Sequence, residues 1–142
     1  GEVLDIIGSK VPLLIEVKAP DGNVAPLCLS VLRALEGYRG PVGVMSFNPE
    51  VSRWFAAHAP RVTRGLVITE TGRRGWRGPF ERRLALWRAR PDFLAYDVRD
   101  LPSRFVRRAR GRGLPVFTWT VRNAKQAKTA RANADQIIYE AS

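Results

Sequence analysis

The stretch PLLIEVK, from Pro12 to Lys18, has the pattern of a buried strand that nevertheless carries two charges. Its apolar run, LLIEV (13–17), is short and partly β-branched, which is typical of a strand in a parallel sheet covered on both faces. Because strand side chains alternate between faces, Glu16 and Lys18 project to the same side, one step apart. The strand therefore presents a carboxylate and an ammonium together at its carboxyl end.

Five similar runs follow along the chain and predict five further strands. They are VGVMSF (42–47), GLVIT (65–69), DFLAYD (92–97), PVFTWTV (115–121) and DQIIYE (135–140). Amphipathic segments separate the runs, so predicted strands and helices alternate from one end of the chain to the other. Such alternation is typical of an α/β fold with a parallel sheet.

The intervening segments carry the signals of five helices. Apolar residues spaced three and four apart between Val24 and Tyr38 predict the first helix, with Asn23 as its cap. The second begins at NPE (48–50), with an asparagine cap and a proline at the first helical position. The other three are marked by Phe80, Leu84 and Trp87, by the segment 102–109, and by the cap Asn123.

Two architectures fit this alternation: an open doubly wound sheet and part of a (β/α)8 barrel. Neither G-x-G-x-x-G nor G-x-x-x-x-G-K-[ST] follows the first strand, which weakens the case for a nucleotide-binding sheet. We treat residues 1–142 as one domain, because the length suits a single core and no linker or repeat interrupts the pattern.

Basic residues dominate the charge of the chain. Lys and Arg number 24 against 13 acidic residues, which gives a net charge of +11 and favours anionic partners. The basic residues are spread along the sequence, so we do not expect nucleic acid as the partner. The arginines of segment 73–77 could contact phosphates or belong to a solvated loop.

Cysteine content and hydropathy bear on the compartment. The single cysteine, Cys28, excludes an internal disulfide and fits a reducing compartment, so we expect a cytoplasmic protein. No apolar run approaches the roughly 20 residues that a membrane span requires.

In either architecture, ligands bind beyond the carboxyl ends of the strands. The residues delivered there are Glu16, Lys18, Ser46, Phe47, Thr69, Glu70, Tyr96, Asp97, Thr118, Trp119, Thr120, Tyr139 and Glu140. Glu16 with Lys18 suits a phosphate bound through a divalent cation, because Mg²⁺ takes one or two carboxylates plus phosphate oxygens. Lys contributes a point charge to phosphate. An ion pair at the strand end is the alternative.

Other candidates are fewer. His58 is the only histidine; we expect it at a helix end, and alone it cannot form an acid/base pair of histidines. Asp97 and Asp100 either cap the following helix or pair with Arg99. Trp119 either stacks on a ligand or belongs to the core.

The segments VPLLIEVK, PVGVMSFNPE, PVFTWTVRN and ADQIIYE occur in the order and approximate spacing of the glycerophosphodiester phosphodiesterases. The chain resembles this family over nearly its whole length. The resemblance implies a TIM-type barrel, of which the chain would hold strands three to eight, six of the eight. It also implies a hydrolase of lipid and glycerol metabolism that uses Mg²⁺ or Ca²⁺ to convert small glycerophosphodiesters to glycerol 3-phosphate and an alcohol.

The resemblance also implies roles for four residues. Glu16 would be a metal ligand and Lys18 would bind the substrate phosphate. Phe47 and Trp119 would line the site near the glycerol moiety. Glu140 is a candidate for the acidic residue that the family usually carries at its last strand.

Several family motifs do not occur in this sequence. H-R-G, E-N-T, E-x-D and a second histidine supply the acid/base histidines and further metal carboxylates, so no catalytic residue is assigned in this chain. We therefore expect part of a site, with the isolated chain inactive and with self-association through open barrel edges. The alternative is a non-catalytic phosphate-binding or interaction module on the same scaffold.

Overall fold

The computed structural model describes residues 13–19, 22–38, 40–70 and 78–138. Its strands are β1 (Leu13–Glu16), β2 (Val42–Ser46), β3 (Thr63–Ile68), β4 (Phe93–Asp97), β5 (Val116–Trp119) and β6 (Gln136–Ile137). They form one sheet in the order β1-β2-β3-β4-β5-β6, and every neighbouring pair is parallel. Each strand therefore lies beside its predecessor in the chain.

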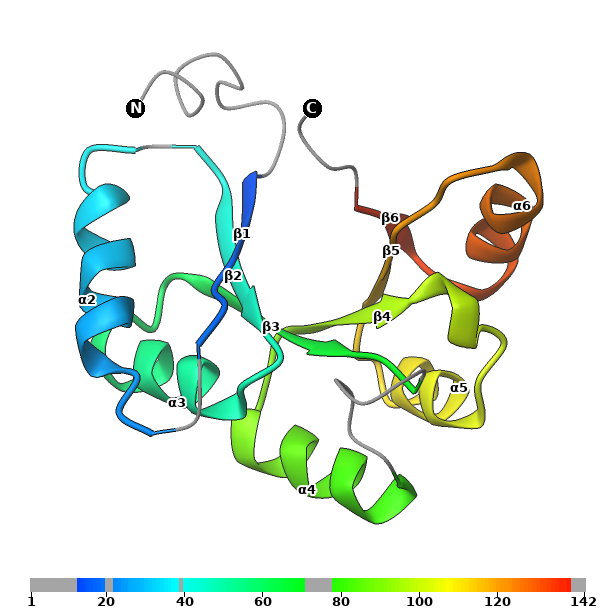
Figure 1. The fold of residues 1–142 in the computed structure, drawn as a ribbon, viewed down its shortest axis with the longest axis horizontal. Helices are drawn as coiled ribbons and strands as arrows, with labels where there is room; N and C mark the ends of the chain where they lie inside the picture. Colours follow the sequence, from blue (N-terminus) through cyan, green and yellow to red (C-terminus); the bar gives the residue numbers. More distant parts are fainter. Residues whose placement is uncertain (1–12, 20–21, 39, 71–77, 139–142) are drawn as a thin grey trace.

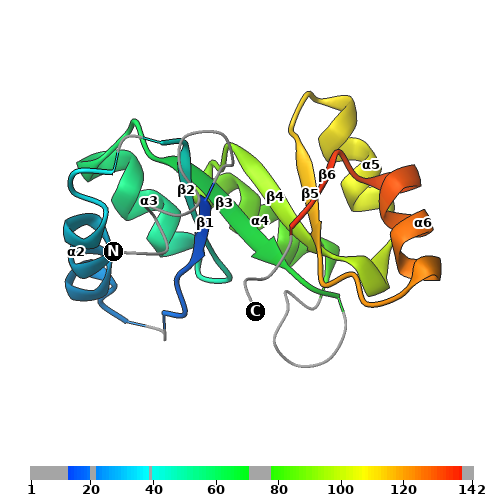
Figure 2. The same ribbon diagram turned by 90° about the horizontal axis from the view of Figure 1, so that it is seen from above.

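Helices join consecutive strands on one side of this curled sheet. They are α2 (Ala25–Ala34), α3 (Pro49–His58), α4 (Pro79–Ala89), α5 (Arg104–Gly111) and α6 (Ala124–Asn133), with a 3₁₀ turn, η1 (Val98–Asp100), before α5. Figure 1 shows α2, α3, α4, α5 and α6 following one another around the outside of the sheet, and Figure 2 gives the same arrangement from above. This is part of a TIM-type barrel, and the doubly wound alternative is excluded.

The two faces of the sheet have different cores. On the convex face, strand side chains pack against helices in two clusters, one around Phe55 and Val44 and the other around Tyr96 and Leu94. The concave face holds a third cluster, whose members come from strands and the residues that directly follow them: Leu14, Met45, Phe47, Val67, Phe93, Ala95, Phe117, Trp119 and Ile138. A barrel lumen is filled in this way by strand side chains.

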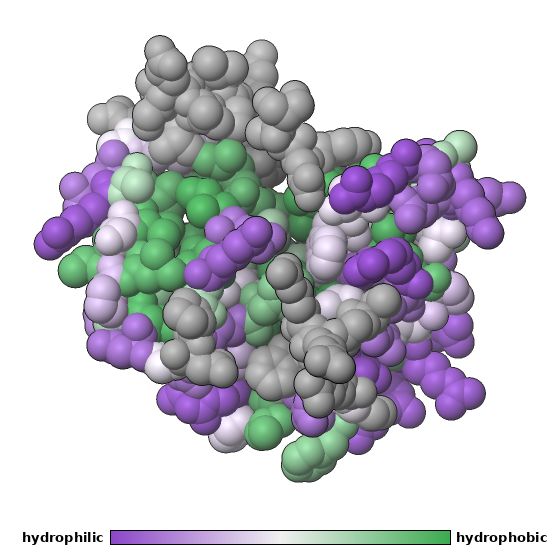
Figure 3. Space-filling model, in the orientation of Figure 1, coloured by the Kyte–Doolittle hydropathy of each residue, from purple (hydrophilic) through white to green (hydrophobic). Residues whose placement is uncertain are grey.

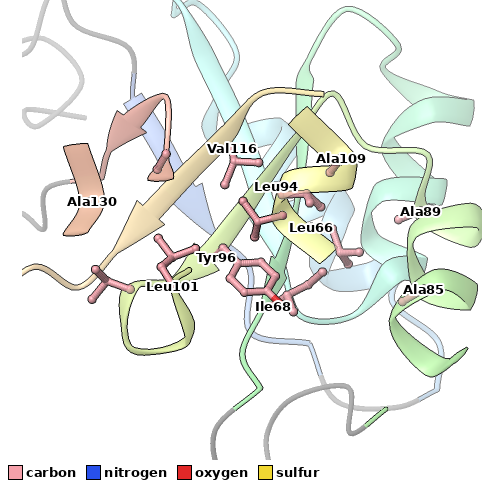
Figure 4. Packing of buried hydrophobic residues seen from close by; sticks show 13 residues of the cluster. Leu66, Ile68, Ala85, Ala89, Leu94, Tyr96, Leu101, Ala109, Val116 and Ala130 are labelled. Atoms are coloured by element: carbon pink, nitrogen blue, oxygen red, sulfur yellow. The ribbon is translucent and has the colours of Figure 1, made fainter. Parts of the chain in front are cut away.

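Small residues allow α4 and α5 to approach the sheet closely. Figure 4 shows Ala85 and Ala89 of α4 and Ala109 of α5 beside Leu94 and the other buried strand side chains. These side chains exclude water from the space between helix and sheet. Burial of apolar surface stabilises the fold by about 25 cal/mol per Å². The helices are thereby fixed to the strands whose ends they follow.

The strand predictions are confirmed in type and order, with shifts at their ends. β3 begins at Thr63 rather than residue 65, because Thr63 and Arg64 pair with Gly43 and Val44 although they are polar. β5 ends at Trp119 rather than 121, and β6 covers only Gln136–Ile137. Tyr139 and Glu140 lie outside the described residues, as do residues 73–77.

The predicted helix caps are also present. Asn48 accepts a hydrogen bond from the Glu50 amide (3.0 Å), and Asn123 accepts one from Gln126 (2.8 Å). Asn23 accepts one from Ala25 (3.1 Å), although it lies one residue before the N-cap position of α2. Such caps stabilise a helix start by about 1 kcal/mol.

Helix α4 does not bury all of its large apolar residues, as a helix on a sheet usually does. Phe80, Leu84 and Trp87 of α4 are exposed, while Ala85 and Ala89 face the sheet. Ala85, Ala89 and the partly buried Leu86 pack toward the sheet, whereas Phe80, Leu84 and Trp87 point outward. None of the described helices is long and apolar enough to cross a bilayer.

Candidate functional site

The end of β1 presents Glu16 and Lys18 on the concave side. Leu14 packs in the concave cluster, whereas Ile15 and Val17 belong to the convex one. Because side chains alternate along the strand, Glu16 and Lys18 follow Leu14 toward the concave side. Both are exposed, and no ion pair between them is found among the described residues. The alternative reading of this strand end, an ion pair between Glu16 and Lys18, is therefore not found among the described residues.

A buried hydroxyl holds this end of β1 in place. The Oγ of Ser46, at the end of β2, donates a 2.5 Å hydrogen bond to the carbonyl oxygen of Val17, the residue between Glu16 and Lys18. The Val17 amide in turn donates to the Met45 carbonyl (2.7 Å). The backbone between the two charged side chains is thus fixed to the neighbouring strand. The sequence places Ser46 at a strand end but does not reveal this role, and its only hint is a hydroxyl that ends a buried run.

Phe47 and Trp119 meet on the concave face. They follow β2 and end β5, yet their rings contact edge to face, with centroids 6.0 Å apart and planes at 86°. The Trp119 indole N–H donates to the Ala95 carbonyl (2.9 Å), which fixes the ring against β4. Both side chains are partly exposed, so Trp119 packs in the concave cluster and still presents ring surface. The peptide bond between Trp119 and Thr120 is cis.

A carboxylate network closes the ends of β3 and β4. Asp97 is buried and accepts hydrogen bonds from Thr69 Oγ1 (2.8 Å) and from the backbone and side chain of Arg99 (2.6–3.0 Å). Burial alone would raise the pKa of Asp97, but the hydrogen bonds from Arg99 and Thr69 outweigh it and lower that pKa. Asp100 accepts from Thr69 (3.2 Å) and the Glu70 amide (2.5 Å). Asp97 thus combines the two alternatives that the sequence left open, since it caps η1 and pairs with Arg99.

A second network lies on the convex side of the same strand ends. The Tyr96 hydroxyl donates to Glu70, which also accepts from Ser103 (3.1 Å) and pairs with Arg82 (3.5 Å). Burial, reinforced by Glu70, raises the pKa of Tyr96 well above its ordinary value. Strand alternation turns Tyr96 toward the helices, so this phenol belongs to the convex core and not to the concave side.

His58 lies where the sequence predicts. It is the last residue of α3, is exposed, and stacks on Trp54 with centroids 4.2 Å apart. Its Nδ1 is 2.9 Å from the Trp54 carbonyl oxygen. This imidazole is fixed to its own helix.

The positions of the described carboxylates show what kind of divalent-cation site the end of β1 could form. No group of three or more His, Cys, Asp or Glu side chains converges anywhere in the described ranges. Asp97 is engaged by Arg99, which leaves Glu16 as the carboxylate on the concave side near Lys18. These residues fit a cation only as a single-carboxylate site completed by water and phosphate oxygens, an arrangement that Mg²⁺ accepts.

The geometry can be compared with known proteins. The Glycerophosphoryl diester phosphodiesterase family matches residues 2–141 of the sequence. The chain belongs to this family. No curated protein matches it.

Solved structures of glycerophosphodiester phosphodiesterases share this fold. A Silicibacter pomeroyi protein named as one is similar with a TM-score of 0.76 at 22% identity, over 97% of this chain and 51% of its own. The Thermotoga maritima enzyme is similar with a TM-score of 0.71 at 16% identity, over 97% of this chain and 57% of its own. A third similar structure is an Oleispira antarctica phosphodiesterase in complex with the product sn-glycerol-3-phosphate. Its TM-score is 0.71 at 17% identity, over 91% of this chain and 51% of its own. The chain thus spans between half and three fifths of these glycerophosphodiester phosphodiesterase structures.

Proposed function

We propose that this chain serves the metal-dependent hydrolysis of glycerophosphodiesters to glycerol 3-phosphate and an alcohol. Family membership supports the reaction class, and the single observation that carries the proposal is the contact of Phe47 with Trp119 on the concave side that Glu16 and Lys18 also face. The two rings offer an apolar surface for a glycerol backbone. Lys18 would bind the phosphate as a cation, and Glu16 would be one ligand of a Mg²⁺ or Ca²⁺ ion.

The chain's own residues would bind and orient the substrate. Ser46 fixes the backbone that carries Glu16 and Lys18, so their spacing from Phe47 is set before a ligand arrives. Such preorganisation lowers the cost of ordering these groups upon binding. A bound divalent cation would supply stabilisation of the negative charge on the phosphate.

Acid/base catalysis is the part that this sequence does not supply. Its only histidine is His58, which stacks on Trp54 at the end of α3. We therefore propose that the 142-residue chain alone turns over glycerophosphocholine little or not at all. Robust metal-dependent release of glycerol 3-phosphate, abolished by Glu16→Gln, would overturn this part of the proposal.

Binding of sn-glycerol 3-phosphate tests the site without requiring turnover. Isothermal titration with Mg²⁺ present should detect binding, and Lys18→Gln should weaken it roughly tenfold or more, since a charge-assisted hydrogen bond contributes about 1.5–3 kcal/mol. Lys128→Gln on α6 removes the same charge elsewhere and should leave the affinity unchanged. Equal affinities for the Lys18 and Lys128 variants would contradict the assignment.

The metal is tested separately by direct binding of Mn²⁺, followed by electron paramagnetic resonance. Glu16→Gln should reduce the Mn²⁺ that is bound in the presence of glycerol 3-phosphate, whereas Glu36→Gln, an exposed carboxylate just beyond α2, should not. Unchanged Mn²⁺ binding in the Glu16 variant would remove that residue from the ligand set.

A non-catalytic phosphate-binding module is the second candidate. The lone histidine of the sequence favours it, as does the lack of converging metal-ligand side chains among the described residues. It predicts glycerol 3-phosphate binding that does not depend on a divalent cation. A cation requirement in the titration would favour the enzyme.

Self-association through strand edges is also a proposal. Within the described residues β1 pairs only with β2, and β6 only with β5, so each leaves an edge of backbone donors and acceptors. Sedimentation velocity over a concentration series should reveal dimers if these edges pair. A single monomer boundary at all concentrations would remove the idea.

A further inference from the structure

Helix α4 carries an apolar stripe on its outer side. Phe80, Leu84 and Trp87 are 77%, 49% and 64% exposed, and their spacings of four and three place them on one side of the helix. Ala85 and Ala89, which face the sheet, lie on the opposite side. In Figure 3 hydrophobic atoms lie at the lower edge of the molecule, where Figure 1 places α4. We call Phe80, Leu84 and Trp87 the outer stripe.

A groove of about 870 Å³ runs between α4 and α5, beside the outer stripe. Trp87 and Arg83 line it from α4, four residues apart on one side of that helix. The facing wall carries Arg104, Arg108 and Arg112, which we call the arginine row. Their spacing of four residues turns all three toward the groove. An aromatic ring and four guanidinium groups therefore share one surface.

None of the four guanidinium groups forms an ion pair with a described residue. The carboxylates that line the groove are Glu70 and Asp100; Glu70 pairs with Arg82, and Asp100 accepts from Thr69. In the part of the chain that the structure describes, the ion pairs engage Arg82, Arg88, Arg99 and Arg110, and none engages Arg83 or the arginine row. Positive charge that the described residues leave without an ion pair favours anionic partners.

We propose that the outer stripe and the arginine row dock the chain on the surface of a membrane that contains anionic phospholipid. Aromatic and leucine side chains on an exposed helix insert at the boundary between headgroups and acyl chains, and flanking basic residues bind the lipid phosphates. Arginine suits this role because its planar fork binds phosphate at two points. The helix lies on the surface and does not span the bilayer.

Two other occupants explain the surface less well. A nucleic acid would satisfy the arginines but has no use for Phe80 and Leu84, which point away from the sheet. A second copy docked through the same surface would bring another set of these arginines, like-charged groups that repel and supply no anion. The surface lies on α4 and α5, on the convex side of the sheet, so the inference stands independently of the proposed reaction.

Vesicle co-sedimentation tests the proposal. The chain should bind vesicles of phosphatidylcholine mixed with phosphatidylglycerol, bind phosphatidylcholine vesicles much less, and dissociate as salt is raised. Changing Arg104, Arg108 and Arg112 together to Gln should weaken binding on the order of a hundredfold, at about 1 kcal/mol per basic residue. The matched control changes Lys125, Lys128 and Arg131 of α6 to Gln, which removes the same charge from another surface. It should bind at least tenfold tighter than the arginine-row variant.

The apolar part is tested with its own variants. Changing Phe80, Leu84 and Trp87 to Ser should weaken vesicle binding tenfold or more, whereas Leu27→Ser with Leu29→Ser, exposed residues of α2, should not. Brominated phosphatidylcholine should quench the fluorescence of Trp87, so Trp87→Phe should retain most binding and lose that quenching. Far-ultraviolet circular dichroism checks that each variant is folded.

Three results would overturn the proposal. The first is equal binding to vesicles with and without phosphatidylglycerol. The second is loss of vesicle binding on addition of RNA while the outer-stripe variant still binds normally, which would assign the arginines to a polyanion. The third is a dimer in sedimentation velocity that the outer-stripe variant abolishes, which would assign the stripe to a second copy.

Discussion

Ser46 and Val17 are 29 residues apart in the sequence and are joined by a 2.5 Å hydrogen bond at the carboxyl ends of β1 and β2. The donor is a buried hydroxyl and the acceptor is the carbonyl between Glu16 and Lys18. One side chain thus couples the stability of two strands to the position of the proposed phosphate site.

Replacement of Ser46 by Ala should affect both properties. The buried carbonyl of Val17 would lose its hydroxyl donor, and we expect a loss of about 2 kcal/mol in the free energy of unfolding. Urea titration followed by circular dichroism measures this value. Ser30→Ala, which removes an exposed hydroxyl bonded to Pro26, should change it by less than about 0.5 kcal/mol. Equal effects of the two substitutions would show that the Ser46 bond is not important for stability.

Asp97 should give the protein a component of stability that depends on pH. Its pKa is lowered in the folded state, whereas in the unfolded chain it titrates near its ordinary value of about 3.9. The ionised folded form is therefore favoured above that pH, and the contribution is lost as the pH falls through the folded pKa. Asp97→Asn should lose about 2 kcal/mol at pH 7.

Comparison of urea titrations at pH 7 and in acid tests this linkage. The Asp97→Asn variant and the parent should converge in stability at low pH, because the parent carboxyl is then protonated. Ser30→Ala, which removes no titratable group, serves as a control and should run parallel to the parent at every pH. A constant gap between the Asp97 variant and the parent would contradict the linkage.

Gly65 is required by close packing on the concave face. A Cβ at this position would lie 2.3 Å from the Phe93 ring, and that ring stacks on Phe117 with centroids 4.8 Å apart. We expect Gly65→Ala to destabilise the protein by about 2 kcal/mol, the usual cost of overpacking. Gly111→Ala, where a Cβ meets nothing within 4 Å, should be neutral or slightly stabilising. Thermal unfolding that ranks the two variants equally would refute this packing argument.

Cys28 should be unreactive in the folded protein. It is fully buried in α2, and burial raises the pKa of its thiol to about 11. Because the thiolate is the reactive form, Ellman's reagent at pH 8 should label native protein slowly and urea-unfolded protein quickly. Rapid labelling of the native chain would mean that α2 opens readily from the sheet.

The order of the elements could be predicted from the sequence because each strand and helix has its own local pattern. Short β-branched runs and caps such as Asn48 and Asn123 depend on neighbours within a few residues. The facing of Glu16 and Lys18 follows from alternation in the same way. Strand ends were less predictable, since Thr63 is polar and yet joins β3 through its backbone.

Features that depend on distant parts of the chain could not be predicted in this way. The stripe of Phe80, Leu84 and Trp87 was a correct signal of a helix, but spacing does not tell which side faces the sheet. That orientation is decided by Ala85 and Ala89, which fit the narrow space against the strands. The bond between Ser46 and Val17 is equally invisible in a local pattern.

The strand order has a consequence for how the chain gains and loses structure. Paired residues such as Leu13 and Val42 are at most 29 positions apart in the sequence. Each pairing of neighbouring strands therefore closes a chain loop of modest length. Loop closure at this range costs little entropy, and each unit of strand, helix and strand can form without waiting for remote segments. Amide exchange should consequently be fastest in β1 and β6 and slowest in β3 and β4. The domain would then melt from its edges toward its middle, as a stack of repeats does.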